Sequence, residues 1–152
     1  TDYVKSISEF KFIEGSLEAL RRLSKFGYPI IVITNQSVVG RGIISEADLI
    51  KIHSYMSSRV REEGSEIQAI FYCPHRPDQN CECRKPKTLL FKQAEEKFQI
   101  SLKDSWFIGD KPSDEEAGRA AGCKTVIVDS NKPNALLGAA SRIVSQYQEK
   151  VA

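Results

Sequence analysis

The strongest constraint on the fold is the alternation of short apolar runs with longer helical patterns along the chain. Residues 28–33 and 124–128 contain uninterrupted stretches rich in Ile and Val, which are typical of strands buried in a parallel sheet. Residues 66–72 and 105–108 have the composition of two further strands. Apolar residues at helical spacing form four stripes around these strands: Leu17, Leu20 and Leu23; Leu49, Ile52, Met56 and Val60 behind a Ser45 cap; Leu90, Ala94 and Phe98; and Ala117, Ala120 and Ala121 behind Ser113. This order predicts an α/β fold, a Rossmann-like doubly wound parallel sheet.

Length and charge limit the classes of protein. We expect the 152 residues to form a single domain, 1–152, with a substantial core. A net charge of +2 with 28% charged residues does not favour nucleic acid or an anionic membrane as a partner. The sequence shows no secretory leader and no apolar run of membrane-spanning length, which favours reduced thiols and a cytoplasmic location. We expect a monomer that acts on a small molecule.

Four potential metal ligands lie within eleven positions, in a loop formed by residues 73–83. Three thiols and one imidazole have the number and type of a closed tetrahedral zinc site: Cys73, His75, Cys81 and Cys83. A disulfide is the alternative, but Cys81 and Cys83 are too close in sequence to pair easily. Because four protein ligands leave no open position for water or substrate, the predicted zinc is structural.

Polar side chains follow two of the predicted strands, where working residues gather in doubly wound folds. Thr34 begins a Thr-Asn-Gln-Ser run after the first strand, and Asp110 follows the third strand. A hydroxyl, an amide and turn N–H groups suit a phosphate oxygen, whereas a carboxylate suits a hard cation such as magnesium. Lys85, directly after the zinc loop, offers the positive charge that a transferring phosphoryl group needs.

Each of these features also has a purely structural explanation. Thr34 and Asn35 after a strand are often a turn and a helix cap. Asp114 favours the start of a helix, and the Arg84-Lys85 pair is typical of solvated surface charge. The order and the spacing of the features together favour phosphoryl chemistry.

Three segments carry a resemblance to a known family: Thr-Asn-Gln-Ser at 34–37 with Arg41-Gly42, Cys-Pro-His at 73–75 with Cys-Glu-Cys-Arg-Lys-Pro at 81–86, and Gly-Asp-Lys-Pro-Ser-Asp at 109–114. The chain resembles the haloacid dehalogenase (HAD) superfamily. More narrowly, it is similar to the branch that holds the D-glycero-D-manno-heptose 1,7-bisphosphate phosphatases and the histidinol-phosphate phosphatases. The resemblance implies a zinc loop in place of the large cap domain of other members.

The resemblance implies a role for each matched residue. Thr34 would hydrogen-bond the transferring phosphoryl group, and Lys85 would neutralise it and hold the nucleophile. Asp110 would bind magnesium, and Asp114 would support the magnesium shell. The substrate would be surrounded by Thr34, Asn35, Gln36, Ser37, Arg84, Lys85, Lys111 and a substrate-loop tyrosine, Tyr3.

One motif of the family is missing from this sequence. These phosphatases begin with an apolar strand ending in Asp-x-Asp-Gly, whose first aspartate attacks phosphorus and whose second acts as acid and base. Asp2 is not expected to be that nucleophile. In the superfamily this strand lies in the middle of the sheet, so we expect a sheet without its central strand and with two unpaired edges. We expect the sequence as it stands to be an inactive, N-terminally incomplete form of a longer hydrolase.

The predicted reaction of the longer enzyme is magnesium-dependent hydrolysis of a phosphomonoester through an aspartyl-phosphate. The favoured substrate is heptose 1,7-bisphosphate, which would place the enzyme in heptose or lipopolysaccharide synthesis, and the alternative substrate is histidinol phosphate. A hypothesis of a different class also stays open at this point: a catalytically inactive binding module.

Overall fold

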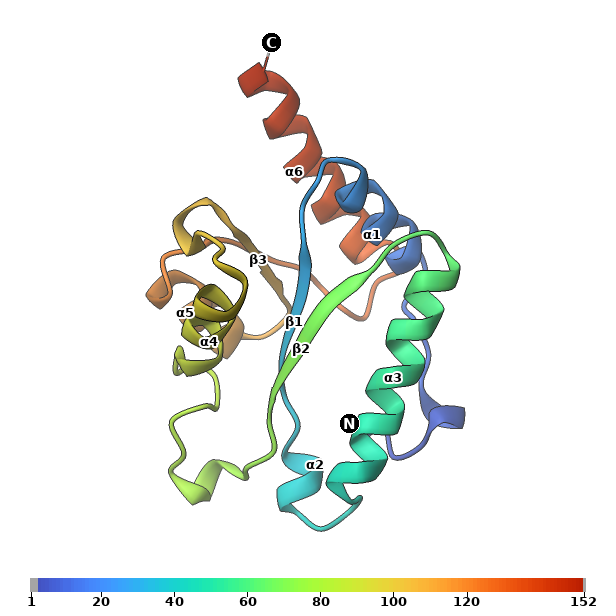
Figure 1. Ribbon diagram of the computed structural model, residues 1–152, viewed down its shortest axis with the longest axis vertical. Helices are drawn as coiled ribbons and strands as arrows, with labels where there is room; N and C mark the ends of the chain where they lie inside the picture. Colours follow the sequence, from blue (N-terminus) through green and yellow to red (C-terminus); the bar gives the residue numbers. More distant parts are fainter. Residues whose placement is uncertain (1–2, 152) are drawn as a thin grey trace.

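The computed structural model describes residues 3–151, with residues 147–151 described by their backbone alone; Asp2 lies outside this part of the chain. Helices and strands alternate, as the sequence predicts (Figure 1). The elements are α1 (Ser16–Lys25), β1 (Ile30–Asn35), α2 (Ser37–Gly40), α3 (Glu46–Glu62), β2 (Ile67–Cys73), α4 (Leu89–Phe98), β3 (Trp106–Gly109), α5 (Pro112–Ala120), β4 (Lys124–Ile127) and α6 (Ala135–Val151). Short 3-10 turns add Ile7–Glu9, Pro77–Gln79 and Leu102–Asp104.

The strands form two parallel pairs instead of one continuous sheet. β1 pairs with β2, with Ile33 opposite Phe71, and β3 pairs with β4, with Ile108 opposite Val126. Among residues 3–151, β1 and β3 are each paired on one side alone, and their unpaired sides face one another across a gap. The predicted α/β fold with parallel strands is therefore present, but as two separate strand pairs among the described residues. The expected absence of a central strand matches the gap.

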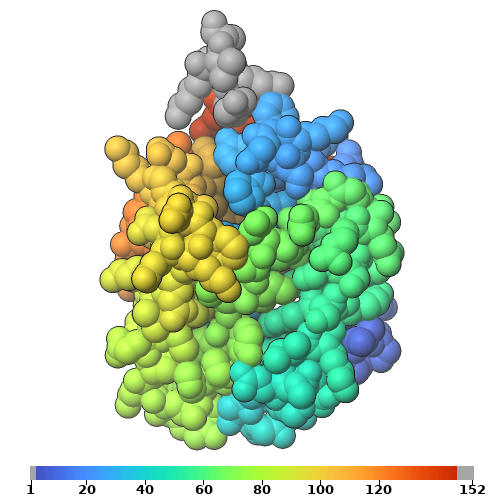
Figure 2. All heavy atoms as spheres, viewed as in Figure 1, coloured from blue at the N-terminus to red at the C-terminus, as the bar shows by residue number. Residues whose placement is uncertain are grey.

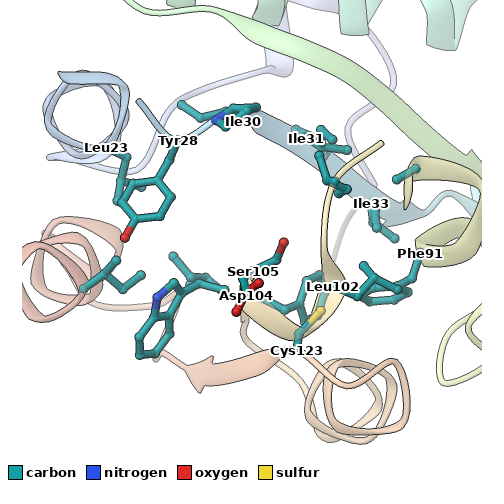
Figure 3. A pocket seen from close by; sticks show the side chains of 18 of the residues that line it. Leu23, Tyr28, Ile30, Ile31, Ile33, Phe91, Leu102, Asp104, Ser105 and Cys123 are labelled. Atoms are coloured by element: carbon teal, nitrogen blue, oxygen red, sulfur yellow. The ribbon is translucent and has the colours of Figure 1, made fainter. Parts of the chain in front are cut away.

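A cavity of about 490 Å³ occupies the space between β1 and β3. Ile30, Ile31 and Ile33 border it on one side in Figure 3, and Leu102 and Cys123 border it on the other. This cavity explains why β1, predicted to be fully buried, is half-buried along its whole length. A strand exposed to an open gap cannot reach the burial of a strand that lies between two neighbours.

Two apolar clusters lie around the gap, and the second of them contains residues of both strand pairs. One joins α1 to α6 through Ala19, Leu23, Ala140 and Ile143, with Trp106 and Ile108 of β3 packed against it. The other centres on Phe91, Leu102 and Ala117, and it receives Ile33 from β1 and Phe107 from β3. Among the described residues, β1 and β3 are therefore joined by side-chain packing and share no backbone hydrogen bonds of a sheet.

The starts of the helices follow local chemistry. At α3 the Ser45 hydroxyl accepts a hydrogen bond from the Asp48 N–H (3.0 Å), as its predicted cap role requires. α5 begins at Pro112, one residue before the predicted Ser113, because proline already has a helical φ and lacks the N–H that a first turn leaves unpaired. The Asp114 carboxylate, not Ser113, accepts from the backbone N–H of Lys111 (3.1 Å). Both α2 and α6 were absent from the predicted set.

Candidate functional site

A buried ion pair lies between the carboxyl ends of β1 and β3. Lys85 Nζ lies 2.5 Å from Asp114 Oδ1, and the two side chains are 9% and 6% exposed. The same ammonium donates to the Ile33 carbonyl (3.2 Å) and lies 5.6 Å from the centroid of the Phe107 ring. Burial alone would raise the pKa of Asp114, but the Lys85 hydrogen bond and charge outweigh it and hold that pKa below its ordinary value.

The segment after β1 is bonded to the backbone of Lys85. Asn35 Oδ1 accepts from the Lys85 N–H (3.0 Å), and Asn35 Nδ2 donates to the Lys85 carbonyl (3.3 Å). Gln36 Nε2 donates to the Thr34 hydroxyl (3.1 Å). The predicted lysine and the predicted Thr-Asn-Gln run therefore meet at one place, although Lys85 lies 50 positions after Asn35 in the sequence.

The segment after β3 reaches the same place through Asp114. Its Oδ2 accepts from the backbone N–H groups of Asp110 (3.0 Å) and Lys111 (3.1 Å), which fixes both residues at the start of α5. The Asp110 side chain is exposed and accepts from the Ser130 hydroxyl (2.8 Å). One buried carboxylate thus connects Lys85 to the loop that carries Asp110.

The four predicted metal ligands form one cluster at the end of β2. Their sulfur and nitrogen atoms all lie within 4.8 Å of one another, and Cys83 Sγ is 3.2 Å from His75 Nδ1. A tetrahedral zinc site with bonds of about 2.3 Å places its ligands roughly 3.8 Å apart. The cluster therefore fits a metal ion in both donor type and spacing.

The cysteines of the cluster differ in acidity. Burial raises the pKa of Cys73 to about 12, with hydrogen bonding to the neighbouring Cys83 thiol as a further cause. For Cys81 burial acts in the same direction, but hydrogen bonds from Cys73 and from backbone N–H groups outweigh it and lower the pKa to about 6. A cluster in which one thiol ionises readily suits an ion that binds thiolates.

The remaining predicted residues lie around this centre at different depths. Arg84 Nη1 donates to the carbonyl of His75 (3.4 Å). Arg84 therefore braces the loop of residues 73–83, called the metal-ligand loop from here on. Ser37 is buried and accepts from Arg41 Nε (3.4 Å). Tyr3 is 41% exposed, and its ring centroid lies 6.0 Å from the Arg41 guanidinium carbon. Tyr3 therefore lies near the end of the α2 turn, beside Arg41.

Sequence reasoning missed two polar residues next to the site. Ser130 bonds Asp110, and it follows β4 as Asp110 follows β3, so the rule that placed Asp110 also applies to it. Arg76 donates to the carbonyl of Gly40 (3.1 Å), and its sequence position beside a metal ligand gave no sign of that contact.

Comparison with known proteins shows which family has this arrangement. The HAD-hydrolase-like family matches residues 82–146. The D-glycero-beta-D-manno-heptose-1,7-bisphosphate 7-phosphatase of Pseudomonas aeruginosa is 42% identical over 137 residues, which cover 90% of this chain and 77% of the relative. The enzyme of the same name from Pasteurella multocida is 38% identical, over 86% of this chain and 75% of the relative. This chain belongs to the heptose bisphosphate phosphatase family of HAD-like hydrolases.

A solved structure supports the same family. The D,D-heptose 1,7-bisphosphate phosphatase of B. bronchiseptica, crystallised with magnesium and phosphate, has a TM-score of 0.88 and 29% identity. The match covers 95% of this chain and 89% of that one. The resemblance to HAD phosphatases inferred from the three sequence segments is confirmed. Across the described residues of this family member, no helix combines the length and the apolar character needed to cross a bilayer.

Proposed function

We propose that this chain provides the phosphate-binding and magnesium-binding part of a phosphatase that hydrolyses D-glycero-D-manno-heptose 1,7-bisphosphate. The observation that carries the proposal is that three segments meet at Lys85: Asn35, next to Thr34, bonds the Lys85 backbone, and Asp114 joins the Lys85 ammonium to the Asp110 loop. The relatives named above, which act on that bisphosphate by name, support the choice of substrate.

Each group has a task that follows from its position. The Lys85 ammonium is fixed by Asp114 and the Ile33 carbonyl, so it offers a preorganised positive charge to a phosphoryl group. The Thr34 hydroxyl and the segment from Asn35, whose side chain bonds the Lys85 backbone, would be hydrogen-bonding partners for phosphoryl oxygens. Ser37, Arg84, Lys111 and Tyr3 surround the sugar in this proposal.

Asp110 fits a magnesium ion, because its carboxylate is exposed and hard cations prefer oxygen ligands. Bound magnesium would neutralise charge that builds up on the phosphoryl oxygens. Asp114 is then a supporting residue that orients the Asp110 loop, since both its oxygens already bind Lys85 and backbone N–H groups. The Cys73, His75, Cys81 and Cys83 cluster would hold zinc as a structural ion.

The attacking group in this proposal is an aspartate on a strand that fills the cavity between β1 and β3. Its carboxylate would displace the sugar oxygen from phosphorus and form an aspartyl-phosphate, while a second aspartate protonates the leaving oxygen. Water would then cleave the acyl-phosphate and regenerate the carboxylate. The unpaired sides of β1 and β3 and the apolar lining of the gap support such a strand.

The deciding experiment measures phosphate release from two substrates, heptose 1,7-bisphosphate and histidinol phosphate. It uses the chain as it stands and a version extended by an apolar strand that ends in Asp-x-Asp. We expect the extended protein to prefer the heptose bisphosphate, and a preference for histidinol phosphate would refute the substrate proposal. That the chain as it stands is inactive stays a prediction without support from the comparisons, and its turnover in the same assay tests it.

A substitution separates the lysine's catalytic role from a general effect of charge. Lys85→Ala in the active protein should lower kcat by about a hundredfold or more, as loss of a preorganised charge does. Lys97→Ala removes a lysine at the far end of α4 and serves as the matched control. Equal rates for the two variants would remove Lys85 from the mechanism.

The cytoplasmic location and the monomeric state of the protein stay predictions.

A further inference from the structure

The α2 turn is bonded to the metal-ligand loop through backbone groups. The Gln36 N–H donates to the Cys73 carbonyl (2.7 Å), and the Gly40 N–H donates to the Pro74 carbonyl (2.8 Å). These bonds hold both ends of α2. Figure 2 shows α2 and the metal-ligand loop in contact at the lower end of the molecule.

Arg76 completes this contact from the side of the loop. Its Nη1 donates to the Gly40 carbonyl (3.1 Å), while its Nε donates to Asp78 Oδ1 (3.0 Å). The aspartate therefore orients the guanidinium toward Gly40. A side chain directly after the predicted ligand His75 thus binds the end of the α2 turn.

The turn is too short to hold its own position. α2 has four residues, and a single helical turn is unfavourable on its own because one hydrogen bond does not offset the cost of fixing several residues. The neighbouring side chains depend on its position: Gln36 bonds Thr34, and Arg41 lies beside Ser37 and Tyr3. Contacts with the metal-ligand loop, together with burial of Val38, therefore order this segment.

We propose that Arg76 is a positioning residue that ties the α2 turn to the metal-ligand loop, so that Gln36, Ser37 and Arg41 are ordered for a sugar phosphate when the loop is ordered by its metal. The specificity part of this inference rests on the proposed function. The coupling between the loop and the turn does not rest on the proposed function, because hydrogen exchange of the backbone amides measures it without any substrate.

Hydrogen exchange of the full chain tests the coupling without any substrate. Zinc-loaded protein is compared with protein stripped by a chelator, and the peptide covering residues 36–42 should exchange about tenfold faster after stripping, as loss of one or two hydrogen bonds implies. The peptide at the start of α3, where Ser45 caps the helix, is the internal control and should change little. Equal exchange of residues 36–42 with and without zinc would overturn the proposal.

Arg76→Gln tests the arginine itself, with Arg119→Gln as the matched control in an exposed arginine that pairs with Glu115. In zinc-loaded Arg76→Gln we expect exchange of residues 36–42 to rise about threefold to tenfold at unchanged zinc content, and Arg76→Lys to restore part of the protection. Exchange that rises throughout the molecule, or in the control alike, would show a merely structural role and overturn the assignment.

A kinetic readout on the protein active in the phosphatase assay adds the specificity part. Arg76→Gln should raise KM for the sugar phosphate several-fold while kcat stays within about twofold, because the turn binds the substrate away from the reacting oxygen atoms. A fall in kcat at constant KM would overturn this part. Failure of the phosphatase activity itself would leave the exchange result unaffected, so the two proposals fail in distinguishable ways.

Discussion

The Lys85–Asp114 ion pair is the feature whose energetics can be tested most sharply. The two charged atoms lie 2.5 Å apart, and more than nine-tenths of each side chain is hidden from solvent. We consider Lys85→Met and Asp114→Asn, singly and together. Methionine preserves most of the volume of lysine without its charge, and asparagine preserves the shape of aspartate.

The magnitudes follow from which group each variant leaves unpaired. Lys85→Met leaves the Asp114 carboxylate buried with two backbone N–H donors and no counter-charge, for which a loss of about 3–5 kcal/mol is expected. Asp114→Asn leaves the ammonium with the Ile33 carbonyl as its hydrogen-bonding partner and should cost a similar amount. The double variant leaves no buried charge at this place, so it should cost about 1–3 kcal/mol less than the sum of the singles.

Urea unfolding at neutral pH of wild type, both singles and the double variant gives the coupling free energy directly. The exposed pair Arg119–Glu115, with side chains 73% and 42% exposed, is the matched control and should show coupling close to the resolution of the assay. Effects of Lys85→Met and Asp114→Asn that add within about 0.5 kcal/mol would refute the reasoning. In that case solvent would be screening the pair despite its low exposure.

Three further outcomes are expected. Cys81→Ser should lower bound zinc and the free energy of unfolding together, measured by metal analysis and thermal melting, and full zinc retention would contradict the ligand set. Gly118→Ala should cost about 1–3 kcal/mol in urea unfolding, because a Cβ there would lie 2.9 Å from the Phe107 ring, whereas Gly138→Ala in α6 meets open space and should stabilise by about 0.5–1 kcal/mol. Because the pKa of Asp114 is lowered in the folded state, its stabilisation is present above its ordinary value of 3.8 and is lost as pH falls through the lower folded value. The stability advantage of wild type over Asp114→Asn should therefore shrink in melts below about pH 4, and a constant difference down to pH 2 would refute that assignment.

The sequence predicted the strands well and their pairing less well. All four predicted strands exist, shifted by one or two residues, because runs of β-branched residues specify extended backbone locally. Pairing is a property of distant segments, so the split into two sheets could be anticipated through the family resemblance and not from residue patterns. The helix at Ser37–Gly40 escaped prediction because its order comes from contacts with residues near Cys73 and not from its own composition.

The candidate site was predictable where two arguments agree: the chemistry of the residue types, and the rule that working residues follow the carboxyl ends of strands in doubly wound folds. Lys85, Thr34 and Asp110 were expected together, and hydrogen bonds through Asn35 and Asp114 bring their segments together. The expected role of Asp114 near a metal gave no hint of its buried salt bridge, since the partner lies 29 positions away in sequence. Burial of a charge is decided by the packing of several elements, which a single sequence does not display.

The gap between β1 and β3 has a consequence for how the molecule loses its structure. Among the described residues, side-chain contacts such as those of Ile33 and Phe107 join the strand pairs, and the pairs share no ladder of backbone bonds. Insertion of a strand would add backbone hydrogen bonds to both edges and make unfolding more cooperative. The width of the unfolding transition therefore indicates whether a strand occupies the cavity between β1 and β3.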